Sequence, residues 1–137
     1  MVVQARAAAT RRRILDAAIT LFADNGYGET GLADILQRAG VSKGAFYYHF
    51  DSKEALASAI IGEFQLRLVD AVQGHFDSDR PTLEGVVRAT FAVQCLMRSD
   101  LSIKIGHELS QALSQVSMAG AKMYGDWTER FAEMVGA

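Results

Sequence analysis

The stretch from Thr30 to Lys53, TGLADILQRAGVSKGAFYYHFDSK, decides the fold of this chain. Its first part, Leu32 to Arg38, predicts a short helix because its apolar residues recur at the spacing of one helical face. Gly40 then closes that helix, since glycine takes the left-handed conformation without steric cost. Ser42 is a typical N-cap for a second helix, from Lys43 to Phe50. The stretch therefore predicts two short helices joined by a tight turn.

The second of these helices has two different faces. Phe46 and Phe50 are four residues apart, so they share one face, which we expect to be buried. Lys43 and Tyr47 share another face, with Gly44 beside them, and we expect this face to be exposed. A helix-turn-helix that is divided in this way predicts a second helix that enters the major groove of DNA.

Composition and charge agree with a helical protein that has one nucleic-acid-facing end. Residues 1–53 hold seven Lys or Arg against five Asp or Glu, a net charge of +2, whereas residues 54–137 hold seven against eleven, a net charge of −4. This asymmetry predicts that the first part faces nucleic acid and the second part faces solvent. No apolar run is long enough to span a membrane. The single cysteine excludes an internal disulfide and is typical of the cytoplasm.

The rest of the chain predicts further helices and no strand. Thr10 is the expected cap of the first helix, which leaves residues 1–9 as an N-terminal arm that is mobile at its start and helical near its end. The other predicted helices cover residues 53–76, 83–98, 101–114 and the region from residue 119 onward. In the helix over residues 83–98, the side chains expected to face inward are Val86, Val87, Phe91, Cys95 and Leu96. The long helix over residues 53–76 is expected to link the DNA-binding end to the remainder.

A resemblance to a known family rests on many positions in residues 10 to 54. They are Ile14 to Ala18, Leu21-Phe22, Gly26-Tyr27, Thr30, Ile35, Ala39 to Gly44, Phe46 to Phe50 and Lys53-Glu54. In this order they resemble the DNA-binding domain of TetR-family transcriptional repressors. The resemblance implies an all-α fold, with a helix-turn-helix domain in residues 1–53 and a helical ligand-binding and dimerisation domain in residues 54–137. Gly31 departs from the pattern, because the family usually has a residue with a side chain there.

The sequence also assigns roles in binding double-stranded DNA. Lys43 can donate to guanine, the Tyr47 ring can pack on a thymine methyl group, and Gly44 lets the backbone approach the groove. The residues expected to contact phosphate are Arg11, Thr30, Ser42, Tyr48, His49 and Lys53. The resemblance implies a homodimer, which would place two recognition helices about 34 Å apart on a pseudo-palindromic operator.

The second part resembles, more narrowly, the gamma-butyrolactone receptor branch of that family. The matching segments are Gln4-Ala5-Arg6, Leu83 to Phe91, and Trp127 after Tyr124-Gly125-Asp126. The resemblance implies a small apolar signalling ligand that releases the repressor from DNA by favouring one of two conformations. The expected ligand contacts are Trp127, Phe64, Gln65, Phe91, Cys95 and Tyr124. Family members are longer, with two further C-terminal helices in a dimer bundle, so we expect this domain to be C-terminally truncated.

Other interpretations stay open at this point. The chain could be a truncated relative that forms inactive heterodimers, or a TetR-type regulator for another ligand, such as a drug or a lipid-like molecule. A small helical enzyme is disfavoured, because the three histidines (residues 49, 75 and 107) are far apart and no metal-binding or catalytic motif occurs. We therefore expect no cofactor and no metal.

Overall fold

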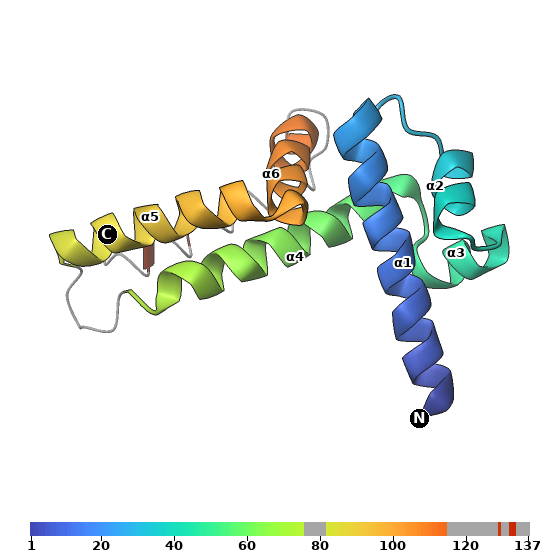
Figure 1. Ribbon diagram of the computed structural model, residues 1–137, viewed down its shortest axis with the longest axis horizontal. Helices are drawn as coiled ribbons and strands as arrows, with labels where there is room; N and C mark the ends of the chain where they lie inside the picture. The colour runs from blue at the N-terminus through green and yellow to red at the C-terminus, as the bar shows by residue number, and fades with distance from the viewer. Residues whose placement is uncertain (76–81, 115–128, 130–131, 134–137) are drawn as a thin grey trace. The chain divides into compact units, whose positions relative to one another are not determined.

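The computed structural model describes residues 1–75 and 82–114, together with residues 129, 132 and 133. Its helices are α1 (Val2–Asn25), α2 (Leu32–Ala39), α3 (Lys43–His49), α4 (Lys53–Gln73), α5 (Leu83–Ser99) and α6 (Leu101–Ser114) (Figure 1). The described residues contain no strand, which confirms the predicted all-α class. The expected helix from residue 119 onward lies outside the described residues, apart from three positions. None of the described helices is long and apolar enough to cross a membrane.

The chain divides into two compact units, Met1–Ile60 and Ile61–Ala137. The sequence placed this division after Lys53, whereas the structure places it within α4. The reason is that the first turns of α4 bury Leu56, Ala57 and Ile60.

In the first unit, α1 lies against α2 and α3 (Figure 1). Its core residues, all no more than 7% exposed, are Ile14, Leu15, Ala17, Ala18, Ile19, Phe22, Ile35, Ala39, Phe46, Phe50, Leu56, Ala57 and Ile60. They recur at helical spacing on each helix, so one apolar face of every helix points into a common core. This core holds α3 in place although α3 has only seven residues.

The prediction that Thr10 begins the first helix is wrong, because α1 already begins at Val2. Residues 2–9 are therefore the first two turns of α1 rather than a separate arm. The run Ala7-Ala8-Ala9 explains the difference, since alanine has the highest helix propensity and extends the helix through a position that could have capped it.

The start of α2 shows how the chain accommodates Gly31. Glycine is the N-cap here and has no side chain to accept a hydrogen bond from the first turn. Instead, the Asp34 carboxylate accepts a hydrogen bond from the Gly31 backbone N–H, at 3.0 Å. A Cβ atom at position 31 would lie 3.0 Å from the same carboxylate oxygen. Glycine therefore leaves room for the Asp34 carboxylate, and the hydrogen bond from the Gly31 N–H offsets part of the missing side-chain cap.

The second unit is built around contacts among α4, α5 and α6. Phe64 and Leu68 of α4 and Ile103 of α6 form a buried cluster. Three partly buried residues of α5 pack against this cluster: Val93, Leu96 and Met97. These contacts confirm that α4 continues its apolar stripe beyond the first unit.

The predicted inward face of α5 is largely wrong. Val86, Val87 and Phe91 are 40%, 46% and 68% exposed, and Cys95 is also exposed. The buried residues are instead Gly85 and Ala89, with Leu96 partly buried. The close approach of the chain at Gly85 explains the difference, because a Cβ atom there would lie 2.7 Å from the His75 carbonyl oxygen. Small residues therefore face the rest of the unit, and the larger ones point outward.

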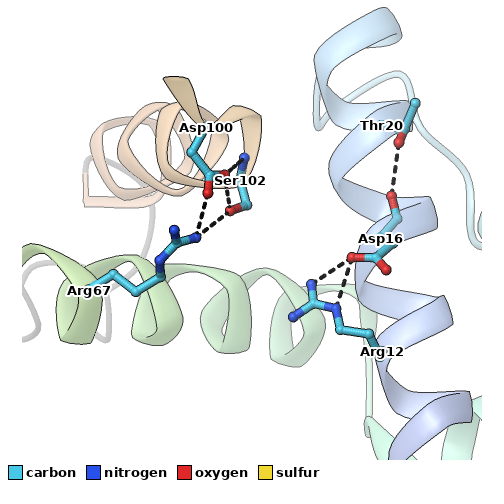
Figure 2. Close-up of polar contacts among 6 residues, drawn as sticks. All are labelled: Arg12, Asp16, Thr20, Arg67, Asp100 and Ser102. Atoms are coloured by element: carbon cyan, nitrogen blue, oxygen red, sulfur yellow. Dashed lines mark hydrogen bonds and ion pairs between the residues drawn. The ribbon is translucent and has the colours of Figure 1, made fainter. Parts of the chain in front are cut away.

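A polar contact ties α4 to the junction of α5 and α6 (Figure 2). Asp100 accepts a hydrogen bond from the Ser102 backbone N–H at 2.9 Å, as an N-cap residue does. Its other carboxylate oxygen lies 2.7 Å from Arg67 Nη1, which also donates to Ser102 Oγ. The hydrogen bond from the Ser102 hydroxyl, with the Arg67 guanidinium, lowers the pKa of Asp100 from its ordinary value.

Asp100→Ala should lower the free energy of unfolding by about 1 kcal/mol, the usual cost of losing an N-cap. The folded-state pKa of Asp100 is depressed, so its stabilising contribution is present above the ordinary pKa of 3.8 and is lost as the pH falls through the folded-state value. Urea unfolding at pH 7 and at pH 3 measures both effects. Glu108→Ala, on the exposed side of α6, is the control. An equal loss at the two pH values would contradict the ionic part of this role.

Candidate nucleic-acid interface

The outer face of α3 carries the side chains that the sequence assigned to DNA. Lys43 and Gly44 are exposed, and Tyr47 and Tyr48 are 46% and 78% exposed. On the opposite face, Phe46 is fully buried and Phe50 is 5% exposed. The predicted division of this helix into a buried and an exposed face is confirmed.

Local contacts hold this face in a defined position. The Ser42 hydroxyl accepts a hydrogen bond from the Ala45 backbone N–H at 3.1 Å and so caps α3. It accepts in this contact, so its proton can still be donated to a phosphate oxygen. The Lys43 ammonium lies 6.0 Å from the centroid of the Tyr47 ring, so the two predicted base-reading side chains are neighbours on this face. The face presents one cation, one glycine and two phenols to solvent.

Tyr48 and His49 extend the same surface at the end of α3. Their rings meet edge to face, with centroids 4.9 Å apart. Tyr48 is exposed and His49 is half-buried, so both can reach a phosphate beside the groove. Their phosphate contacts stay predictions.

The three consecutive arginines of α1 have separate intramolecular partners. The Arg11 guanidinium lies 5.2 Å from the centroid of the Phe50 ring. Arg12 forms an ion pair with Asp16 at 2.8 Å, and the Asp16 backbone carbonyl accepts a hydrogen bond from Thr20 (Figure 2). Arg13 reaches the turn after α2. The phosphate contact assigned to Arg11 remains a prediction, beside the contact with Phe50.

Two predicted phosphate contacts are engaged inside the first unit. Thr30 is 1% exposed, and its hydroxyl lies within hydrogen-bonding distance of two carbonyl oxygens, those of Gly26 at 2.8 Å and Leu21 at 3.2 Å. The Lys53 ammonium donates to the carbonyl oxygens of Tyr27 at 2.9 Å and Thr30 at 3.0 Å. These contacts join the loop before α2 to the start of α4. Thr30 is buried by its contacts, whereas Lys53 is partly exposed and has two of its three N–H groups paired. The phosphate contacts assigned to both residues stay predictions.

The structure describes four of the six predicted ligand contacts. Trp127 and Tyr124 lie outside the described residues. Phe64 belongs to the buried cluster with Leu68 and Ile103, and Gln65 is half-buried on the same helix. Phe91 and Cys95 lie on the exposed face of α5. The sequence placed the last two inward because both apolar stripes of α5 have helical spacing.

Two residues that the sequence analysis did not assign take part in specific contacts. The His107 ring of α6 lies 5.9 Å from the Phe64 ring and 3.2 Å from the Gln111 amide nitrogen. Arg13 contacts backbone atoms 26 and 27 residues away. No local sequence pattern predicts a contact over such a separation.

Comparison with known proteins places this geometry in context. The family model of the tetR family of bacterial regulatory proteins matches residues 14–60. The A-factor receptor protein of Streptomyces griseus is 37% identical over 135 residues, which cover 98% of this chain and 46% of the receptor. The chain therefore spans less than half the length of this relative.

Solved structures of TetR-family proteins are also similar to this chain. The TetR-family protein CprB of S. coelicolor A3(2) matches with a TM-score of 0.76 and 31% identity, over 94% of this chain and 66% of that protein. A gamma-butyrolactone receptor described as ArpA-like matches with a TM-score of 0.70 and 35% identity, over 77% of this chain and 55% of that protein. The helical arrangement is thus shared with bacterial transcription regulators.

Proposed function

Because the chain belongs, through residues 14–60, to the tetR family of bacterial regulatory proteins, we propose that it is a sequence-specific DNA-binding transcriptional repressor and not an enzyme. The observation that supports this most strongly is α3, whose buried Phe46 and Phe50 turn Lys43, Gly44 and Tyr47 outward. A short helix anchored in this way fits the major groove, which is wide enough for one α-helix.

The proposed contacts divide into those that read bases and those that bind phosphate. Lys43 donates to guanine, and the Tyr47 ring packs on a thymine methyl group, while Gly44 keeps the backbone close to the groove. Ser42, Tyr48, His49 and Arg11 bind phosphate and fix the register of the helix along the DNA. Such a regulator would act in the cytoplasm, as a homodimer on an operator with two half-sites.

Selection of duplexes from a random pool, followed by light scattering of the complex, tests this function. We expect the pool to converge on a pseudo-palindromic sequence, with half-sites about one helical turn apart. The complex should contain two copies of the chain. Recovery of random sequences, with weak binding that depends strongly on salt, would contradict sequence-specific repression by this chain.

We further propose that the ligand is a small apolar molecule of the gamma-butyrolactone type. The support is the similarity to the A-factor receptor over nearly the whole chain. A ligand releases DNA only if it binds the DNA-incompetent conformation more tightly, by a few kcal/mol. A regulator that responds to a drug or a lipid-like molecule would satisfy the same requirement, so a panel of all three classes should be compared.

Trp127→Ala should abolish release of the operator by the ligand and leave operator binding intact. An indole offers a flat apolar wall and one N–H donor, which suits a lactone ring with a carbonyl group. Titration of the ligand into the preformed complex, followed by fluorescence anisotropy of labelled DNA, measures the release. Phe91→Ala, on the exposed face of α5, serves as a comparison. An unchanged response in the Trp127 variant would remove Trp127 from the site.

A second candidate function is that of a partner for a longer relative, in a heterodimer that does not bind DNA. The observation in its favour is the exposed apolar face of α5, where Leu83, Val87 and Phe91 are 81%, 46% and 68% exposed. Contiguous apolar surface of this kind is typical of protein interfaces. Co-expression with a full-length homologue distinguishes the two functions, because a heterodimer subunit would co-purify with the homologue and reduce its operator binding.

A further inference from the structure

Arg13 closes the end of α2 from a different helix. Its Nε and Nη2 atoms donate to the Ala39 carbonyl oxygen at 3.2 and 2.7 Å, and Nη2 also donates to the Gly40 carbonyl oxygen at 2.8 Å. The planar guanidinium suits this contact, because its donors form a fixed fork. Its charge also lies at the negative end of the α2 dipole, where a cation is stabilising.

These two carbonyl groups are among those that the backbone hydrogen bonds of the turn leave unpaired. The last turn of a helix has carbonyl groups without an intrahelical partner. Here Gly40, with φ 63° and ψ 42°, is left-handed, and its N–H donates to the Gln37 carbonyl at 3.2 Å. The Val41 N–H donates to the Leu36 carbonyl at 3.1 Å, which completes a Schellman motif. Arg13 then donates to the Ala39 and Gly40 carbonyl groups, and so extends the cap that the backbone began.

The position of this cap decides what it does. Only three residues, Gly40 to Ser42, separate α2 from α3, so the conformation of this turn sets the direction of α3. Arg13 is anchored to the core by its neighbour Ile14, which is fully buried. Position 40 leaves little space for change, because a Cβ atom there would lie 3.3 Å from Arg13 Nη2 in addition to the strain of a positive φ.

We propose that Arg13 is a positioning residue for DNA reading, which holds the turn between α2 and α3 from α1 and so fixes the angle at which α3 presents Lys43 and Tyr47. This role rests on the proposed DNA-binding function. It differs from a phosphate contact, the usual assignment for an arginine near DNA, because the guanidinium donors that the structure pairs point to backbone carbonyl groups.

The test compares Arg13→Gln and Arg13→Lys with the wild type, and uses Arg12→Gln as a matched control. The control removes the same charge from the same turn of α1, but leaves the α2 cap intact. Affinity is measured for the selected operator and for an unrelated duplex over a range of salt, well below the unfolding temperature. Amide hydrogen exchange at Val41 reports the state of the turn without DNA.

For Arg13→Gln we expect about tenfold weaker operator binding, the effect of losing charge-assisted hydrogen bonds. The affinity for the unrelated duplex and the salt slope should be nearly unchanged, and the Val41 amide should exchange faster. Arg13→Lys should recover part of the operator affinity, because it keeps the charge and some donors but not the fork. Arg12→Gln should keep the ratio between operator and unrelated DNA.

Three results would overturn the positioning role. A salt slope smaller by about 0.9, with both duplexes weakened equally, would make Arg13 a phosphate contact. Faster exchange at the Val41 amide, with an unchanged ratio of operator affinity to unrelated-duplex affinity, would mean that Arg13 stabilises the turn and has no role in DNA reading. If Arg12→Gln lowers the ratio of operator affinity to unrelated-duplex affinity as much as Arg13→Gln does, the effect comes from the lost charge and not from the α2 cap. If the wild type selects no duplex, the proposed function fails and the reading role with it, while the exchange data still decide whether Arg13 caps α2.

Discussion

Lys43→Met should weaken binding to the selected operator by about 1–3 kcal/mol and relax the preference at one base pair in each half-site. The ammonium group is the only formal charge on the exposed face of α3 between Lys43 and Tyr48, so no other side chain in that stretch offers a charged donor to guanine. Methionine keeps the unbranched stem and the helix propensity, which leaves the removal of the charged donor as the main change.

This substitution should not change the stability of the fold. Lys43 is exposed, and the aromatic contact that the structure gives it, at 6.0 Å from the Tyr47 ring, is at the outer limit for a cation–π interaction. We therefore expect the urea midpoint of Lys43→Met to equal that of the wild type. Binding assays on a set of operators, each with one changed base pair, measure the specificity. An equal loss on every sequence would mean that Lys43 binds phosphate and does not read a base.

Much of the DNA-binding unit could be predicted because its signals are local. The glycine that ends α2, the serine that caps α3 and the two phenylalanines one turn apart each act within a few residues. Their contacts in the structure follow the expected pattern. The start of α1 could not be fixed in this way, since Thr10 can cap a helix and the alanines before it can extend one. The high helix propensity of the alanines extends α1 to Val2.

The roles of the cations depend on distances that no local pattern contains. Arg13 and Lys53 each reach backbone carbonyl groups more than 20 residues away. A basic side chain near DNA suggests a phosphate contact, and only the packed unit shows the backbone carbonyl groups to which these two side chains donate. The face of α5 was mistaken for a related reason. Two apolar stripes fit the same helix, and the close approach at Gly85 selects the one with small residues.

Lys53→Met should lower the free energy of unfolding by about 2 kcal/mol, because hydrogen bonds from a charged donor are worth more than neutral ones. The ammonium group donates to the Tyr27 and Thr30 carbonyl groups and lies 4.4 Å from the centroid of the Tyr27 ring. Removal of the group leaves two carbonyl oxygens without this donor. The same partly buried ring has a hydroxyl group without a partner, and burial raises the pKa of Tyr27.

The same substitution separates the structural role of Lys53 from the phosphate contact that the sequence suggested. If Lys53 supports the loop before α2, urea unfolding should detect the loss. Operator binding at a temperature where the variant is folded should then keep its salt slope. If Lys53 instead binds phosphate, stability should be unchanged, and the slope should fall by about 0.9 as one counterion fewer is released. Lys43→Met is the matched comparison in the same unit, since it should change binding and spare stability. Opposite responses of the two lysines would establish that similar charges, ten residues apart, serve recognition in one case and the fold in the other.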